Sequence, residues 1–400
     1  MEKDKLEPKL RFPGFTEPWE HRKLGDEAHI IMGQSPDGST YSKEPSDYIL
    51  IQGNADLING WVVPRTWTTQ ITKLAEPGDL IMSVRAPAGE MGKTLYKAVI
   101  GRGVAAIKGN EFLYQLLTKM NVEGYWKRLA AGSTFESLNS KDIYNSRIAV
   151  PPETEQGQIG RLFSTIDKTI ALHQRKEEEL QKLKKGLLQK MFPKDGESVP
   201  EVRFPNFTNT WEQRKLIEIT DRVLRKNKNL ESKRPLTISA QDGLVDQETY
   251  FNKRIASENL SNYILVKRGE FAYNKSYSSG FPWGAIKRLD KYENGVVSSL
   301  YIVFSLKCDQ VDPFFLEQYF DTDRWFDEIR IRAAEGARNH GLLNIPASDF
   351  FDINLGIPSI DEQIEIGRFL EDISKTIALH HRKTEELKKL KKALLQQMFV

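Results

Sequence analysis

A near-identical octapeptide occurs twice in this sequence and constrains the fold more than any other feature. Lys168–Arg175 reads KTIALHQR, and Lys375–Arg382 reads KTIALHHR, 207 positions further on. The match extends without a gap over Glu155–Phe192 and Glu362–Phe399. Because the two stretches share most of their residues, we expect them to adopt the same structure. Whatever each stretch connects should then also be present twice.

Both copies carry apolar residues at helical spacing. The steps between them alternate between four and three, which is the heptad seam of a coiled coil. Neither copy contains an internal proline, so about 40 residues at ~1.5 Å each predict a rod of roughly 60 Å. A lone helix would leave this apolar stripe in water, so the two helices are expected to pack on each other. The predicted seam residues are Ile159, Phe163, Ile166, Ile170, His173, Leu180 and Leu187, and then Ile366, Leu370, Ile373, Ile377, His380, Leu387 and Leu394.

A second repeat marks where each half of the chain begins. Arg11–Leu24 (RFPGFTEPWEHRKL) matches Arg203–Leu216 (RFPNFTNTWEQRKL), 192 positions apart. Each half therefore runs from an opening motif through a variable stretch to a long helix. We predict a globular domain over residues 1–152, a helix over 153–192, a second globular domain over 193–357 that begins with the polar connector 193–201, and a helix over 358–400.

The two variable stretches predict mixed α/β (α+β) globules. Short β-rich runs between Gly and Pro turns occur at Tyr48–Ile51, Leu80–Val84, Leu95–Ile100, Val296–Phe304 and Asp352–Ile357. Amphipathic helical segments are predicted at Glu111–Leu129 and Pro313–Ala334.

Weaker similarities connect the two variable stretches. Glu76–Ser83 parallels Lys267–Asn274, a Gly turn that opens a strand, and Gly132–Gln156 parallels Gly336–Gln363. A shared frame with different contents indicates two equal scaffolds that carry two different specificities.

Composition indicates a globular chain of two or three domains. Its 400 residues are 39% hydrophobic, which is enough for real cores. No run approaches the ~18–20 apolar residues of a membrane helix, so no membrane association is expected. Cys308 is the single cysteine, which fits a reducing cytoplasm. The formal net charge of +3 neither requires nor excludes nucleic acid.

Motifs of catalysis and metal binding are absent from the sequence. There is no GxSxG elbow, no HExxH and no GxGxxG after a strand. Gly92-Lys93-Thr94 resembles the end of a phosphate-binding loop, but the leading glycine is replaced by Pro87. The six histidines lack a second ligand at metal-site spacing. We therefore expect a chain without an active site or metal of its own.

The variable stretches do carry basic, amide and aromatic residues on turn-rich segments. Arg and Lys suit guanine edges or phosphates, Asn and Gln suit adenine, and Tyr offers a stacking face. For any one of these residues an ordinary solvated side chain is the simpler interpretation, so only the collective pattern favours nucleic acid. The candidate DNA-binding residues are Gln34, Ser35, Arg65, Arg85, Lys93, Ser133, Thr134, Lys275, Tyr277, Lys287, Arg288, Arg338 and Asn339.

The order of these motifs resembles the specificity (S) subunit of type I restriction-modification systems. The resemblance covers the full chain: two PWE or TWE openings that end in RKL, two variable regions, the GDL and GEF turns, the junctions that end in EQ, and two helices that end in LLQKMF and LLQQMF. It implies that the variable regions are target recognition domains, each reading one half of a split DNA sequence. It also implies that the helices pack antiparallel, as a spacer and as a dock for two modification subunits.

The same resemblance implies a division of labour between subunits. The partner modification subunits would carry S-adenosylmethionine and methylate adenine N6, and restriction subunits would use ATP and Mg to translocate and cleave DNA. This chain would bind double-stranded DNA, hold no cofactor and catalyse nothing. The alternative is a coiled-coil scaffold or adaptor whose two globules bind proteins, which gives no reason for two similar globules with divergent interiors.

Overall fold

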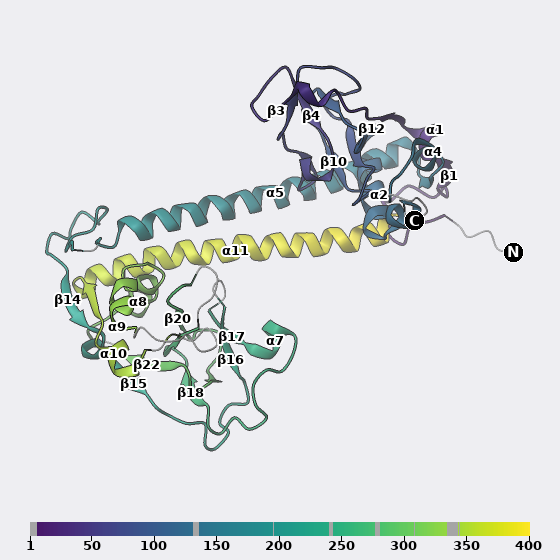
Figure 1. The fold of residues 1–400 in the computed structure, drawn as a ribbon. Helices are drawn as coiled ribbons and strands as arrows, with labels where there is room; N and C mark the ends of the chain where they lie inside the picture. The colour runs from purple at the N-terminus through teal and green to yellow at the C-terminus, as the bar shows by residue number, and fades with distance from the viewer. Residues whose placement is uncertain are drawn as a thin grey trace. The chain divides into compact units, whose positions relative to one another are not determined.

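The computed structural model describes residues 6–130, 136–194, 196–239, 243–276, 281–307, 309–333, 343 and 345–400. The chain divides into two compact units, residues 1–174 with 381–400 and residues 175–380 (Figure 1). The two long helices form as predicted, α5 over Glu153–Lys190 and α11 over Ile360–Met398. Each unit contains part of both helices. In the described part of the chain, no helix has the length and apolar character to cross a membrane.

Each long helix is fixed at its start to the opening motif of its own half. Arg11 donates two hydrogen bonds of 2.7 and 2.8 Å to the buried carboxylate of Glu155. Arg203 makes the equivalent pair of bonds, both 2.7 Å, to the buried Glu362. A buried carboxylate is costly unless it is paired and hydrogen-bonded, so each bidentate pair ties an opening motif to the first turn of a helix.

The helices run antiparallel within each unit, and the predicted packing of the helices on each other is confirmed. In the first unit Lys391 Nζ lies 2.6 Å from Asp167 Oδ1, and Phe163 shares a core with Phe399. In the second unit Phe192 shares a core with Leu370. Six predicted seam residues are buried: Ile159, Phe163, Ile166, Ile366, Leu370 and Ile373. The remaining eight are half-buried, and their role in partner docking stays a prediction: Ile170, His173, Leu180, Leu187, Ile377, His380, Leu387 and Leu394.

Each unit contains its own four-stranded antiparallel sheet, and the strand order is the same in both; this common arrangement is called the shared sheet. In the first unit its order is β2 (His29–Met32), β12 (Val104–Lys108), β9 (Leu80–Ser83) and β10 (Met91–Lys93). In the second unit the order is β15 (Thr220–Val223), β22 (Ile302–Leu306), β19 (Phe271–Asn274) and β20 (Ala285–Arg288). A two-stranded ladder also occurs in both, β1 (Glu20–Lys23) with β13 (Arg147–Val150) and β14 (Glu212–Lys215) with β23 (Asn354–Ile357). The mixed α/β fold class predicted from the sequence is confirmed.

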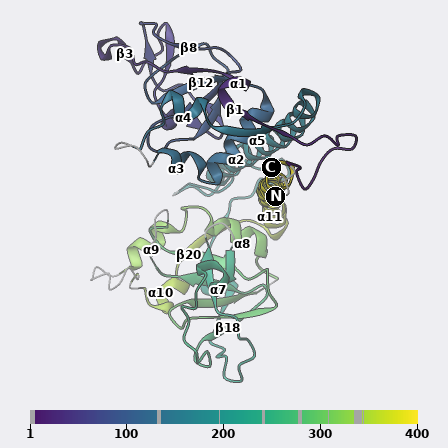
Figure 2. The ribbon, with the colours of Figure 1, turned by 90° about the vertical axis from the view of Figure 1, so that its right-hand side faces the viewer.

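Both faces of the shared sheet are buried, which explains why β9 and β19 read as continuous apolar runs. Leu80 and Met82 of β9 join the core beneath α2 (Glu111–Val122), whereas Ile81 packs against a second sheet. In β19, Phe271 joins the core beneath α8 (Pro313–Phe320) and Ala272 packs on the opposite side. Figure 2, in which α11 is seen end-on, shows α2 beside α5 in the first unit, where Gln115 donates a 2.8 Å hydrogen bond to Asp167.

Two predicted strands begin later than expected, at Ala98 and at Asn354, and three predicted segments are each divided into two elements. The segment Glu111–Leu129 is two helices, α2 and α3 (Tyr125–Ala130), because Gly124 between them adopts φ +75°. The segment Pro313–Ala334 is α8 and α9 (Phe326–Arg332), and α8 ends at Phe320, whose carbonyl accepts the indole N–H of Trp325 at 3.1 Å. The run Val296–Phe304 is two strands, β21 (Asn294–Val297) and β22, separated by a turn.

Outside the shared frame the two units differ. The first adds the strands β5 (Leu57–Ile58) and β6 (Trp61–Val62) to its sheet and has a separate five-stranded sheet. That second sheet contains β3 (Tyr41–Ser42), β7 (Trp67–Thr68), β4 (Tyr48–Ile51), β11 (Ala98–Ile100) and β8 (Leu74–Ala75), with 3-10 turns at Gly38–Thr40 and Asn54–Asp56. The second unit has β16 (Leu236–Ser239), β17 (Gly243–Asp246), α7 (Gln247–Phe251) and β18 (Ile264–Lys267), the last paired with β21. Short helices common to both are α1 (Leu24–Glu27), α4 (Ser140–Tyr144), α6 (Leu216–Ile219) and α10 (Ala347–Phe351).

Candidate nucleic-acid interface

The segments that follow β9 and β19 are equivalent in the two units. The backbone carbonyl of Val84 accepts the N–H of Leu138 at 2.9 Å, and the carbonyl of Lys275 accepts the N–H of Leu343 at 2.9 Å. Arg85, the next residue in the first unit, is exposed and forms an isolated antiparallel β-bridge with Ser137. Lys275 therefore corresponds to Val84, and Arg85 is one residue further along, so two of the predicted DNA-binding residues follow the ends of the central strands.

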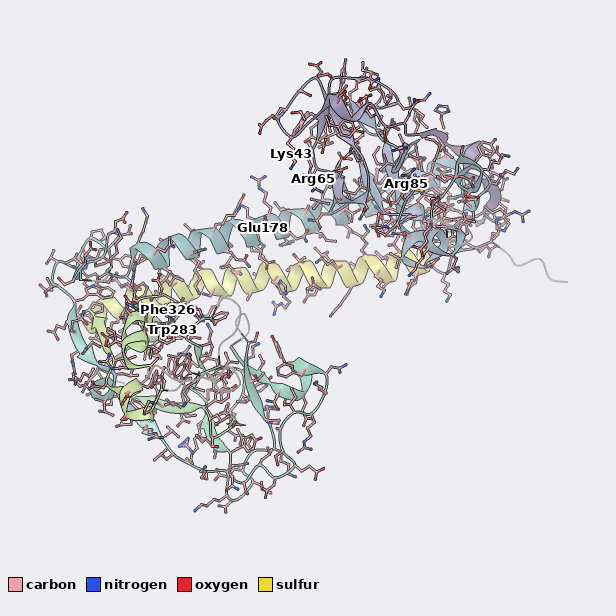
Figure 3. The ribbon with its side chains drawn as sticks, viewed as in Figure 1. Lys43, Arg65, Arg85, Glu178, Trp283 and Phe326 are labelled. Carbon is pink, nitrogen blue, oxygen red and sulfur yellow. The ribbon has the colours of Figure 1, made fainter. Side chains whose placement is uncertain are left out.

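Three basic side chains of the first unit, Lys43, Arg65 and Arg85, are exposed. Figure 3 labels these three residues on the first unit. Arg65 donates one hydrogen bond of 3.0 Å to the carbonyl of Ala55, and no carboxylate among the described residues forms an ion pair with any of these three cations. Unpaired cations of this kind are suited to phosphates or guanine edges. Lys43 was not among the sequence candidates, because nothing in its local sequence distinguishes it from a solvated lysine.

Gln34 and Ser35 lie at the start of the same variable region. Gln34 is exposed, and its backbone carbonyl accepts a 2.5 Å hydrogen bond from Thr72. The hydroxyl of Ser35 accepts the backbone N–H of Arg102 at 3.1 Å. These contacts fix the backbone of the segment and leave the amide of Gln34 at the surface.

Lys93 and Arg288 occupy equivalent positions and are both held inside their units. Lys93 stands opposite Leu80 in the β9–β10 ladder, and Arg288 stands opposite Phe271 in the β19–β20 ladder. Lys93 Nζ lies 3.0 Å from Glu111 and 4.4 Å from the centre of the Tyr114 ring. Arg288 is 7% exposed and lies 3.3 Å from Glu317, with its guanidinium 4.3 Å from the Phe314 ring. Contact of Lys93 and Arg288 with DNA stays a prediction.

Lys287 and Lys275 also have partners in the second unit. Lys287 Nζ lies 2.5 Å from Asp321 Oδ1, and Asp321 also pairs with Lys184 of α5 at 3.3 Å. Lys275 Nζ donates to the carbonyl of Ile345 at 3.2 Å, and burial together with Arg222 lowers the pKa of Lys275. The remaining candidates, Ser133, Thr134, Tyr277, Arg338 and Asn339, lie outside the described residues.

A buried carboxyl in this cluster makes the second unit sensitive to pH. Burial raises the pKa of Glu317 from 4.5 to about 7, although Arg288 opposes the shift. Between pH 4.5 and about 7 the folded state therefore binds more protons than the unfolded state. The stability that the protonated carboxyl contributes is lost as the pH rises through 7. Glutamine cannot ionise. Between pH 5 and 8 we therefore expect the unfolding free energy of Glu317→Gln to fall by about 1–3 kcal/mol less than that of the wild type.

Denaturant unfolding of both proteins at pH 5 and pH 8 measures this difference. Glu365→Gln, at an exposed position on α11, is the matched control and should keep the wild-type pH dependence. Identical pH profiles for wild type and Glu317→Gln would contradict the assignment.

Within the described residues, no group of three His, Cys, Asp or Glu side chains is placed to hold a metal ion.

Comparisons with known proteins agree with this architecture. Residues 16–182 match the family model of the type I restriction modification DNA specificity domain. A putative type I restriction enzyme MjaX specificity subunit from Methanocaldococcus jannaschii is 34% identical over 182 residues, 43% of this chain. That match spans only 42% of the relative's length. The type I restriction enzyme MjaVIII specificity subunit from the same organism is 23% identical over 407 residues, which cover 96% of this chain and 92% of the relative.

A solved structure has the same fold over its whole length. The crystal structure of the type-I restriction-modification system S subunit from M. genitalium superimposes with a TM-score of 0.68 at 13% identity, covering 98% of this chain and 99% of that one. The matched specificity domain, the relative aligned from end to end and the internal duplication make this chain similar to the specificity (S) subunits of type I restriction-modification systems, and the solved structure shows the same fold.

Proposed function

We propose that this chain reads a two-part DNA sequence and that each unit recognises one half of it. The observation that carries the proposal is the shared four-stranded sheet, with the same strand order and the same covering helices, to which each unit adds different strands. A common frame with different additions is suited to presenting two different reading surfaces to one kind of ligand. The exposed cations Lys43, Arg65 and Arg85 supply the attraction to phosphate in the first unit.

The long helices act as the spacer and the dock for two modification subunits. Four exposed leucines support docking: Leu172 and Leu183 on α5, and Leu379 and Leu390 on α11, each pair related by the 207-residue repeat. On α5 they lie eleven residues apart, which is about three helical turns, so they share one face. Exposed apolar side chains in such a row are typical of protein-binding surfaces. Their repetition fits two copies of one partner subunit.

Chemistry belongs to the partner subunits in this proposal. S-adenosylmethionine is held by the modification subunits, which methylate adenine N6 in each half-site, and the restriction subunits use ATP and magnesium to move along and cleave unmodified DNA. This chain recognises the target DNA sequence for the complex and acts in the cytoplasm.

Exchange of one variable region tests the proposal. Replacing residues 33–148 by the corresponding region of another specificity subunit should change only one half of the methylated sequence, because the frame and the second unit remain intact. Sequencing of methylated adenines in cells that carry the complete system reads out both halves and the gap. The reciprocal exchange in the second unit is the matched control and should change only the other half.

Two results would contradict the proposal. A change in both halves after a single exchange would show that the units do not read independently. Methylation that keeps its sequence after either exchange would favour a scaffold whose globules bind proteins.

A further inference from the structure

The β5–β6 hairpin of the first unit presents an apolar surface to solvent. Leu57 and Val62 form the inward cross-strand pair, and Ile58 and Trp61 form the outward one. Ile58 is 47% exposed, Trp61 38% and Val63 37%. Three neighbouring large apolar side chains on a hairpin tip are costly to leave in water and mark a binding surface.

This hairpin is held rigidly in place. Its two-residue turn has φ +52° at Asn59 and +79° at Gly60, and a side chain at Gly60 would overlap the hydroxyl of Tyr114. The carbonyl of Gly60 accepts the backbone N–H of Lys93 at 3.0 Å. The buried carboxylate of Asp56 accepts the N–H of Gln52 at 2.7 Å just before the hairpin begins. The apolar tip is therefore preorganised and does not have to fold when it binds.

The hairpin borders the region that carries the exposed cations. Gly60 lines a cleft of about 910 Å³ together with Ala86 and Pro87, which follow Arg85. Arg65 follows Val63 by two residues and is exposed, as Arg85 is. Positive charge attracts the phosphates of DNA, and an apolar tip is suited to the apolar groups of its bases.

The second unit also has a hairpin beside the last strand of its four-stranded sheet, β16–β17 next to β20, but none of the described residues of these two strands is exposed, so the apolar surface occurs in the first unit alone. Two copies of one modification subunit need equivalent surfaces on the two units. A surface found in one unit alone is therefore poorly suited to docking them, and well suited to reading one half-site.

We infer that the β5–β6 hairpin enters the major groove of the first half-site, and that Ile58 and Trp61 contact the C5-methyl group of a thymine. The inference rests on the proposed function and deepens it. The major groove admits a two-stranded ribbon, and the thymine methyl is the apolar group on its floor. Burying that methyl group against an apolar side chain removes apolar surface of both from water.

Removal of that methyl group tests the inference. In the purified complex with modification subunits, each thymine of the first half-site is replaced in turn by deoxyuridine, which lacks only the C5-methyl. At one position wild-type binding should weaken about fourfold, the factor expected for burying one methyl-sized group. For the double variant Ile58→Ala/Trp61→Ala the same replacement should have no effect, because both contacts are already lost, and each single variant should show a smaller effect than wild type.

Controls separate reading from folding and docking. Leu224→Ala, at a 63% exposed leucine of the second unit, should retain the wild-type response to deoxyuridine. Ile58→Ala leaves the Lys93–Trp61 contact in place, so it tests the idea even if Trp61→Ala lowers the melting temperature.

Two outcomes would overturn the inference. These are equal deoxyuridine effects in wild type and variants, and no deoxyuridine effect at any thymine of the first half-site. Loss of modification subunits from the variants with DNA preference retained would make the surface a protein interface. A wild-type complex without any sequence preference would instead refute the proposed function, so the two failures are distinguishable.

Discussion

Replacing Phe399 by alanine should lower the unfolding free energy of the first unit by about 3–5 kcal/mol, the usual cost of deleting a buried aromatic ring. Phe399 is 3% exposed and stacks on Phe112 of α2 with ring centres 5.2 Å apart. It also lies 6.1 Å from Trp19 and 5.6 Å from Phe163. One ring therefore joins the end of α11 to the opening motif, to α2 and to α5.

Amide hydrogen exchange resolved by unit measures this effect, because it reports the local free energy of opening. The amides of β9 and β12 should lose protection in Phe399→Ala. Phe192→Ala is the matched variant in the second unit, where Phe192 stacks on Phe315 at 5.6 Å, and it should deprotect β19 and β22 instead. Unchanged protection of β9 and β12 in Phe399→Ala would contradict the role assigned to this ring.

Sequence reasoning predicted the parts of the fold that depend on local pattern and repetition. The two long helices follow from a gapless repeat with a heptad stripe, and the strands Tyr48–Ile51 and Leu80–Ser83 follow from short β-rich runs between turns. The breaks after α2 and α8 were missed because amphipathic spacing continues across them. Only a left-handed backbone at Gly124 in one case, and an indole bonded to the carbonyl of Phe320 in the other, ends the helix.

The candidate site was less predictable, because charge alone does not say which partner a side chain meets. Lys93 and Arg288 have the composition of DNA contacts, yet Glu111 and Glu317 lie next to them through packing that is distant in sequence. The β5–β6 hairpin did leave a signal. Asn59-Gly60 between two apolar pairs is the sequence signature of a two-residue hairpin turn.

Repeated helices do not make identical contacts, which also could not be read from the repeat. Lys184 and Lys391 are equivalent residues, but Lys391 pairs with Asp167 of α5 and Lys184 pairs with Asp321 beyond the end of α8. The position equivalent to Asp167 is Ser374, so the second copy lacks the carboxylate that would accept the lysine. The apolar seam is thus common to both helices, and the polar contacts around it distinguish the two units.

Inserting seven residues into both long helices should abolish methylation at the original target and create methylation at sites with a longer gap. If helix length sets the unread gap, two added turns lengthen each helix by ~10.5 Å, which corresponds to at most about three base pairs at 3.4 Å per step. Seven residues preserve the phase of the apolar stripe, so the helices can still pair. Equivalent insertion points after Ala171 and Ala378 keep the two lengthened helices matched.

Insertion into α5 alone is the control for this prediction. It leaves helices of unequal length, which cannot pair along both seams within the two units, and methylation at any gap should be lost. Methylome sequencing reports half-sites and gap together, so it separates a changed spacer from a changed reading surface. With both insertions the half-site sequences should stay the same while the gap grows, because the residues proposed to read DNA lie outside the helices. An unchanged gap in an active complex would mean that the units are positioned by their partner subunits and not by the helices.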